Sequence, residues 1–158
     1  MYKTILVALD GSALAEHSLP HATALAKAFE ARIHLVRVFD VQSLAAGAMP
    51  LADPAFAAAG ATAQLYEQAL EAERETVSEY LSGVAARLKP EGATVEYSVQ
   101  QGAAAEIIAA LAEELPADLV VLTSRGQGGF KRFIFGSVTE DVIRKVEKPV
   151  LVVPNQED

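Results

Sequence analysis

Short apolar runs alternate along this chain with longer segments in which apolar residues recur every three or four positions. The short runs are typical of strands, and the longer segments are typical of amphipathic helices. The expected strands cover residues 4–9, 33–39, 94–99, 118–123 and 149–153, and the expected helices cover residues 13–29, 65–88, 103–115 and 137–146. Strands separated by helices pair in parallel, with helices on both faces of the sheet. The pattern therefore predicts an α/β fold with an open, doubly wound parallel sheet.

The chain of 158 residues shows no internal repeat and no linker. We therefore expect one domain over residues 1–158, large enough to bury a substantial core. Residues 42–60 lack the periodicity of a helix or a strand and are rich in alanine, with interspersed glycine and proline. We interpret residues 42–60 as a mobile loop.

Composition and charge exclude several classes of function. The net charge of −8 argues against a general affinity for nucleic acid. The absence of cysteine excludes disulfides, thiolate metal sites and thiol nucleophiles. No apolar run approaches the roughly 20 residues that span a bilayer, and the first residues lack a signal-peptide pattern. We expect a soluble, cytoplasmic protein with neither nucleic acid nor membrane as a partner.

The segment after the fourth expected strand, residues 123–137, has features that favour a bound polyphosphate. Its glycines allow close approach of the backbone to a ligand; they are Gly126, Gly128, Gly129 and Gly136. Its basic residues concentrate positive charge in an acidic chain; they are Arg125, Lys131 and Arg132. Ser137 stands at a helix start, where backbone N–H groups and the helix dipole attract anions.

The same residues allow a purely structural interpretation. Ser137 and Glu140 have the spacing of a capping box, in which their side chains satisfy backbone donors of the helix. The glycines also suit a flexible loop, and the basic residues a solvated edge. Neither the phosphate-binding string GxxxxGK followed by Ser or Thr nor a complete dinucleotide fingerprint is present. The residues alone leave phosphate binding and helix capping equally open.

The histidines do not indicate a metal site. His17 and His21 lie four positions apart, but no third ligand is evident, and Pro20 is expected to disturb the helix between them. We interpret both as surface residues, and His34 as a structural residue of the second strand. No serine–histidine–aspartate set or metalloprotease motif is recognisable, so we predict no catalytic residue and no protein metal site.

Two blocks of the sequence resemble the universal stress protein family, and the resemblance extends over nearly the whole chain. The first block is Ile-Leu-Val-Ala-Leu-Asp-Gly-Ser at residues 5–12, and the second covers residues 118–154. The ATP-binding branch of the family carries G-x2-G-x9-G-S/T. Gly126, nine intervening residues and the pair Gly136-Ser137 match its larger part, while Thr123 replaces the first glycine. Thr123 either weakens binding through its side chain or contributes a hydrogen bond.

The resemblance implies a sheet in the order 3-2-1-4-5, with a nucleotide site between strands one and four. It implies that Asp10 binds the ribose, and that Ala8 and Val38 line the adenine slot. The implied floor of the site consists of Leu122, Thr123, Arg125 and Gly126. The residues implied to hold the phosphates are Gly136, Ser137, Val138 and Thr139. Mg²⁺ or Mn²⁺ would be carried by the phosphates rather than by a protein cage.

The resemblance further implies an ATP-binding regulatory protein of the stress response. It implies a homodimer formed through the edge strand 150–153. The alternative is that residues 156–158 of the same chain cover that edge. Other protein partners are unknown. Two alternatives for the function remain: a dimeric interaction module of the same fold without nucleotide, and a slow ATPase. We expect slow ATP hydrolysis at most.

Overall fold

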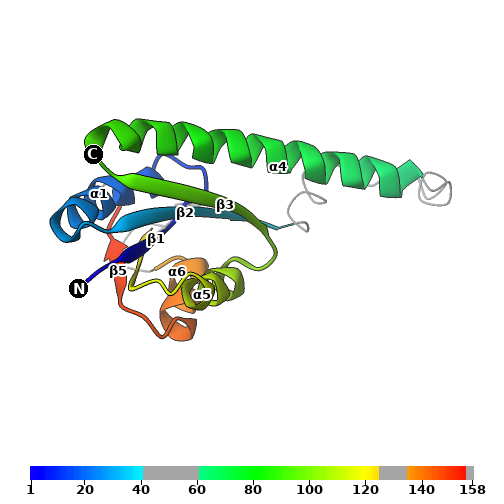
Figure 1. The fold of residues 1–158 in the computed structure, drawn as a ribbon. Helices are drawn as coiled ribbons and strands as arrows, with labels where there is room; N and C mark the ends of the chain where they lie inside the picture. Colours follow the sequence, from blue (N-terminus) through cyan, green and yellow to red (C-terminus); the bar gives the residue numbers. More distant parts are fainter. Residues whose placement is uncertain (41–60, 125–134, 156–158) are drawn as a thin grey trace.

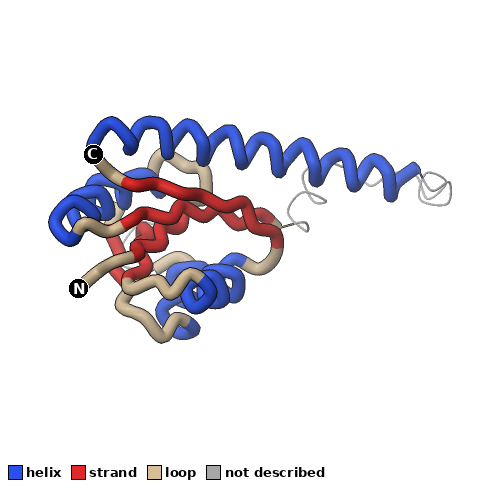
Figure 2. Tube along the Cα trace, in the orientation of Figure 1, coloured by secondary structure: helices blue, strands red, loops and turns tan. Residues whose placement is uncertain are grey.

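One parallel sheet lies between two layers of helices in the computed structural model, which describes residues 1–40, 61–124 and 135–155 (Figures 1 and 2). The strands are β1 (Thr4–Ala8), β2 (Arg32–Phe39), β3 (Thr94–Gln101), β4 (Leu119–Thr123) and β5 (Val150–Val153). Their order is β3-β2-β1-β4-β5, and all four pairings are parallel. The predicted fold class and strand order are therefore confirmed.

The helices divide between the two faces of the sheet. On one face lie α1 (Ser18–Phe29) and α4 (Ala61–Leu88), and on the other lie α5 (Ala104–Glu114) and α6 (Ser137–Lys145) (Figure 1). Two single-turn 3₁₀ helices are η1 (Ala15–His17) and η2 (Lys89–Glu91). The expected loop at residues 42–60 lies outside the described residues.

The sheet has a core on each face because successive side chains of a strand point to opposite sides. Ile5 and Val7 of β1 pack on the face of α1 and α4, together with Leu81 of α4. Leu6, between them in the sequence, packs on the opposite face with Ile108 of α5. All of the β1 residues from Thr4 to Val7 are buried, which explains why the sequence shows a continuous apolar run rather than an alternation.

The first helical segment departs from the prediction. We expected one helix over residues 13–29 that Pro20 disturbs, whereas the chain forms η1 and then α1 from Ser18. Pro20 lies in the first turn of α1, where backbone N–H groups have no partner within the helix, so a proline is tolerated. His17 and His21 are both exposed on this segment.

The pairing of β1 with β4 is fixed at its start by Asp118. Its Oδ2 atom accepts hydrogen bonds from the backbone N–H groups of Lys3, at 2.7 Å, and Thr4, at 3.0 Å. The N–H of Asp118 in turn donates to the carbonyl of Thr4. These backbone donors lower the pKa of Asp118, because they stabilise its charged form. One side chain therefore sets the register of the two strands.

We predict that Asp118→Asn lowers the free energy of unfolding near pH 7 by on the order of 1 kcal/mol. Because the folded pKa is lowered, the stabilisation is present above the unfolded value of about 3.9 and is lost as the pH falls through the folded value. Urea denaturation of both proteins between pH 7 and pH 3 measures this difference. Glu75→Gln, at an exposed carboxylate of α4, is the control and should change little. A difference independent of pH would contradict the assignment.

Candidate functional site

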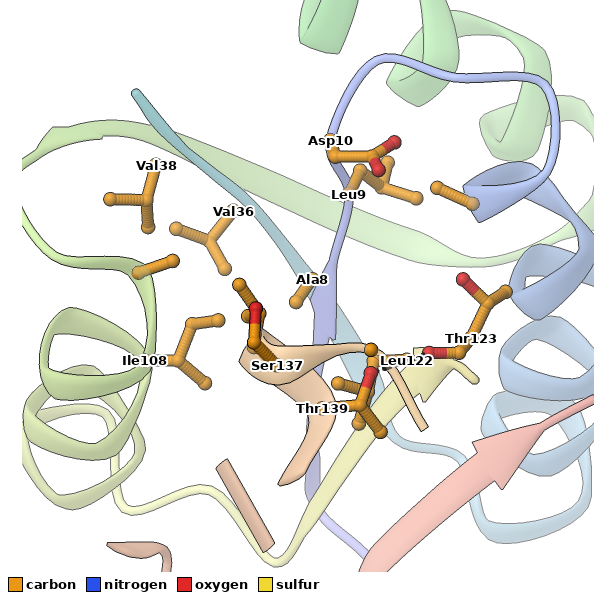
Figure 3. A pocket seen from close by; sticks show the side chains of 14 residues that line it. Ala8, Leu9, Asp10, Val36, Val38, Ile108, Leu122, Thr123, Ser137 and Thr139 are labelled. Carbon is orange, nitrogen blue, oxygen red and sulfur yellow. Dashed lines mark hydrogen bonds between the residues drawn. The ribbon is translucent and has the colours of Figure 1, made fainter. Parts of the chain in front are cut away.

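A pocket of about 300 Å³ opens at the carboxyl ends of β1, β2 and β4, between α5 and the start of α6 (Figure 3). This is the point where the strand order reverses, since the chain adds β2 and β3 on one side of β1 and then β4 and β5 on the other. The residues that line the pocket are Ala8, Leu9, Asp10, Ala15, Val36, Val38, Ala104, Ile108, Leu122, Thr123, Gly136, Ser137, Val138 and Thr139.

One side of the pocket is apolar. Val36 and Val38 stand two positions apart on β2, so both face the same side of the sheet, toward Ala8 of the neighbouring strand (Figure 3). Ile108 of α5 closes this side. The surface suits a flat apolar group, because every side chain on it is aliphatic.

Asp10 stands at the end of β1, in a turn that orders its carboxylate. Its Oδ1 atom accepts hydrogen bonds from the backbone N–H of Ser12, at 2.8 Å, and from the Ser12 hydroxyl. The Ser12 oxygen accepts a further bond from the N–H of Ala15, at 3.1 Å, which joins the turn to η1. Gly11, between Asp10 and Ser12, has φ +84°, a conformation that favours glycine. The turn therefore presents a positioned hydrogen-bond acceptor to the pocket.

The capping box, which the residues alone left as open as phosphate binding, does not form at the start of α6. Gly136, in an extended conformation, is the N-cap residue, and no side chain of the described residues caps the helix. Ser137 is already the first helical residue, and the side chain of Glu140 lies 4.0 Å from Arg144 instead. Within the part of the chain that the structure describes, the first three amides of α6 therefore have no capping side chain. All three residues that carry them line the pocket.

The start of α6 is held against the ends of β4 and β5. The carbonyl of Ser124 accepts from the N–H of Gly136 at 2.8 Å, and the N–H of Ser124 donates to Val153 at 2.9 Å. The hydroxyl of Thr139, which is 4% exposed, donates to the carbonyl of Thr123 at 3.0 Å. The side-chain hydroxyl of Thr139 thus holds the helix in position, and the backbone N–H of the same residue belongs to the first turn of α6.

Every predicted site residue that the structure describes lines this one pocket. These residues are Ala8, Asp10, Val38, Leu122, Thr123, Gly136, Ser137, Val138 and Thr139. Arg125, Gly126, Lys131 and Arg132 lie outside the described residues. Thr123, in the place of the missing glycine, is only 5% exposed and pairs with Val153 in the sheet. The roles in nucleotide binding stay predictions.

Sequence reasoning missed several lining residues. They are Leu9, Ala15, Val36, Ala104 and Ile108. The alternation of β2 could have indicated Val36, since it shares a face with Val38. Ala104 and Ile108 lie one helical turn apart after β3, but only the packing of α5 against β2 brings them to the pocket.

The described lining of the pocket consists of aliphatic side chains, hydroxyl groups, one glycine and one carboxylate. Asp10 is its one ionisable lining residue within the described chain. Among these same residues, no group of three His, Cys, Asp or Glu side chains is placed to hold a metal ion.

No helix in the described ranges is both long and apolar enough to cross a membrane.

An apolar slot, an ordered carboxylate and a helix start meet in this α/β protein at the point where the strand order reverses, which is where sheets of this class usually bind ligands. The model of the universal stress protein family matches residues 1–154. The chain belongs to the universal stress protein family.

Relatives and solved structures agree with this assignment. Universal stress protein MJ0531 of Methanocaldococcus jannaschii is 31% identical over 153 residues, which is 97% of this chain and 82% of that protein. The structure of hypothetical protein MJ0577 is similar with a TM-score of 0.83 and 26% identity, covering 100% of this chain and 99% of the other. The structure of the universal stress protein of Archaeoglobus fulgidus in complex with dAMP is similar with a TM-score of 0.62 and 26% identity, covering 96% of this chain and 97% of the other.

We predict that Thr139→Val lowers the free energy of unfolding by about 1 kcal/mol, because it removes the buried hydroxyl that donates to Thr123. Thr139→Ser keeps the donor and serves as the matched variant, with a smaller loss. Urea denaturation followed by circular dichroism measures both. Equal stability of the Val and Ser variants would show that the hydrogen bond does not hold α6 in place.

Proposed function

We propose that this chain is an ATP-binding regulatory protein of the cytoplasmic stress response, with the nucleotide held in the pocket described above. The observation that carries the proposal is the start of α6, whose first amides meet no capping side chain among the described residues and line the same pocket as Asp10. Amides of this kind bind phosphate oxygens, and the positive end of the helix dipole adds to the attraction.

The residues present fit the three parts of an adenine nucleotide. The aliphatic surface of Ala8, Val36, Val38 and Ile108 suits the flat base. The carboxylate of Asp10 accepts hydrogen bonds from ribose hydroxyls. The backbone of Ser137, Val138 and Thr139 suits the phosphates.

Two further observations support a nucleotide. The solved Archaeoglobus fulgidus relative is a complex with dAMP, an adenine nucleotide. The spacing of Gly126, Gly136 and Ser137 matches the larger part of the motif of the ATP-binding branch. Mg²⁺ or Mn²⁺ would neutralise the phosphates and take most of its ligands from them, since Asp10 is the one carboxylate on the described wall of the pocket.

The other two candidate functions make different predictions. A dimeric interaction module without nucleotide would bind no ATP and would leave no nucleotide in acid extracts of the purified protein. A slow ATPase would need a group that activates water; Asp10 is the one ionisable group available in the described lining, and its carboxylate is engaged by Ser12. The proposed binding mode also assigns the Asp10 carboxylate to the ribose hydroxyls, so ATP binding without substantial turnover is the function that the pocket supports best.

We predict that Gly136→Val abolishes measurable ATP binding while the fold is retained, because a branched side chain at the N-cap obstructs the approach of phosphates to α6. Isothermal titration with ATP and Mg²⁺ measures the affinity. Gly83→Val is the matched control, since a Cβ at Gly83 of α4 meets no atom within 4 Å.

The titration has three informative results. Loss of binding in Gly136→Val alone supports the proposed site. Normal binding by Gly136→Val would show that the phosphates do not reach α6. Absence of binding in the unmodified chain, together with nucleotide-free acid extracts, would refute the proposed function.

The proposal includes a homodimer through β5, which is an edge strand of the sheet. Val120 of β4 donates to the carbonyl of Pro149, and Ser124, directly after β4, donates to the carbonyl of Val153. Residues alternate in direction along a strand, so the N–H and C=O groups of Val152 point away from β4. An apolar edge whose outward backbone groups have no partner among the described residues favours pairing with a second copy of the strand.

We predict that Val152→Pro converts the dimer into a monomer, because it removes an outward N–H without breaking a bond to β4. Val152→Ala keeps this N–H and should stay dimeric. Sedimentation velocity distinguishes the two forms. A dimeric Val152→Pro, or a monomeric unmodified chain, would contradict the proposed interface.

A further inference from the structure

Arg37 of β2 lies beneath the turn that carries Asp10. A Cβ built on Gly11 would come within 2.6 Å of Nη1 and 2.8 Å of Cζ of Arg37. The guanidinium is therefore packed directly against the backbone of the turn, on the face of the sheet opposite the pocket. The turn, which has positive φ at Gly11, therefore lies against this group.

The same guanidinium contacts α4. Its Cζ atom lies 5.7 Å from the centre of the Tyr80 ring, and its Nη2 atom lies 3.8 Å from Oε1 of Glu73. The Arg37 side chain is only 21% exposed, so these contacts are less screened by water than those of a surface arginine. Arg37 thus connects the turn on one side with two residues of α4 on the other.

A second connection joins the same helix to the residues that follow the turn. The hydroxyl of Tyr80 donates to Oε1 of Glu16, in η1, at 3.0 Å. The other oxygen of Glu16 lies 3.0 Å from Nη2 of Arg87, also on α4. Since η1 is joined to the turn through Ser12 and Ala15, both ends of this segment are attached to α4.

Electrostatics supports this connection. The pKa of Tyr80 is raised well above its ordinary value, mainly by burial and then by its hydrogen bond to Glu16. The charge of Arg37 opposes this rise, and the charge of Asp10 adds to it. The carboxylate that lines the pocket and the guanidinium beneath it therefore act on the same side chain of α4.

We infer that Arg37 is a positioning residue, which orients the Asp10 turn for the ligand and couples occupation of the pocket to α4 through Tyr80 and Glu73. The inference rests on the proposed function, because it requires a ligand that contacts Asp10. Coupling of this kind is reciprocal: a ligand that orders the turn also orders α4, and a partner that binds α4 changes the affinity for the ligand.

The test compares Arg37→Gln with Arg74→Gln. Arg74 is a matched control because it also carries a positive charge near an aromatic ring, 5.7 Å from the centre of Phe39, but it bonds Gln101 instead of the turn. Titration with ATP and Mg²⁺ measures affinity, and hydrogen–deuterium exchange of residues 73–88 with and without ATP measures the response of α4. We expect Arg37→Gln to lose roughly tenfold in affinity and to lose the ATP-dependent protection of α4. Arg74→Gln should keep both.

A double-mutant cycle separates positioning from a general loss of stability. If Arg37 acts through the Asp10 turn, Arg37→Gln should lower the ATP affinity by less than about threefold in a chain that already carries Asp10→Asn. If the effects of the two substitutions on the free energy of ATP binding simply add, the proposal is overturned. If Arg37→Gln does not fold, Arg37→Lys serves instead, because it keeps the charge and lacks the planar group; it should lose at least about threefold in affinity.

The outcomes distinguish this proposal from the one on which it rests. An unmodified chain that binds no ATP refutes the proposed function and the coupling together. An unmodified chain that binds ATP, with an Arg37 variant that binds equally well, refutes the coupling alone. ATP binding that leaves the exchange of residues 73–88 unchanged in the unmodified chain also refutes it.

Discussion

The parallel pairing of β1 with β4 is the constraint on which the rest of this structure depends. The chain builds outward from β1 to β2 and β3, and then returns to add β4 and β5 on the other side. The helical elements that follow β1 and β4 in the chain, η1 and α6, lie on opposite faces of the sheet, and residues of both line the pocket. Asp118, which binds two backbone amides at the start of β1, fixes this pairing at the opposite edge.

Much of this arrangement can be predicted from the sequence because the strands are buried on both faces. Apolar runs mark β1, β2, β4 and β5, and the expected bounds of each of these four strands differ from the observed bounds by a single residue at one end. The strand order and the site residues came from the family resemblance rather than from periodicity. Periodicity indicates which segments are strands, but it carries no information about which strands are neighbours.

The remaining errors have a tertiary cause. The spacing of Ser137 and Glu140 is as typical of a capping box as of a phosphate site, and local sequence cannot decide between them. In the structure, the N–H of Gly136 is held by the carbonyl of Ser124, so the helix begins at Ser137 and its hydroxyl is not at the N-cap position. Likewise, no local pattern could place Arg37 under Gly11, since their contact depends on how the turn crosses the end of β2.

Under the proposed function, the ligand becomes part of the folding equilibrium, because no side chain of the described residues caps α6. A helix whose first amides have no side-chain partner leaves that role to whatever anion binds there, and such an anion stabilises the folded state by mass action. Because Ser124 and Thr139 join the start of α6 to the ends of β4 and β5, this stabilisation extends to the sheet. Under the proposed function, the melting temperature of the protein is then a measure of how much nucleotide is present.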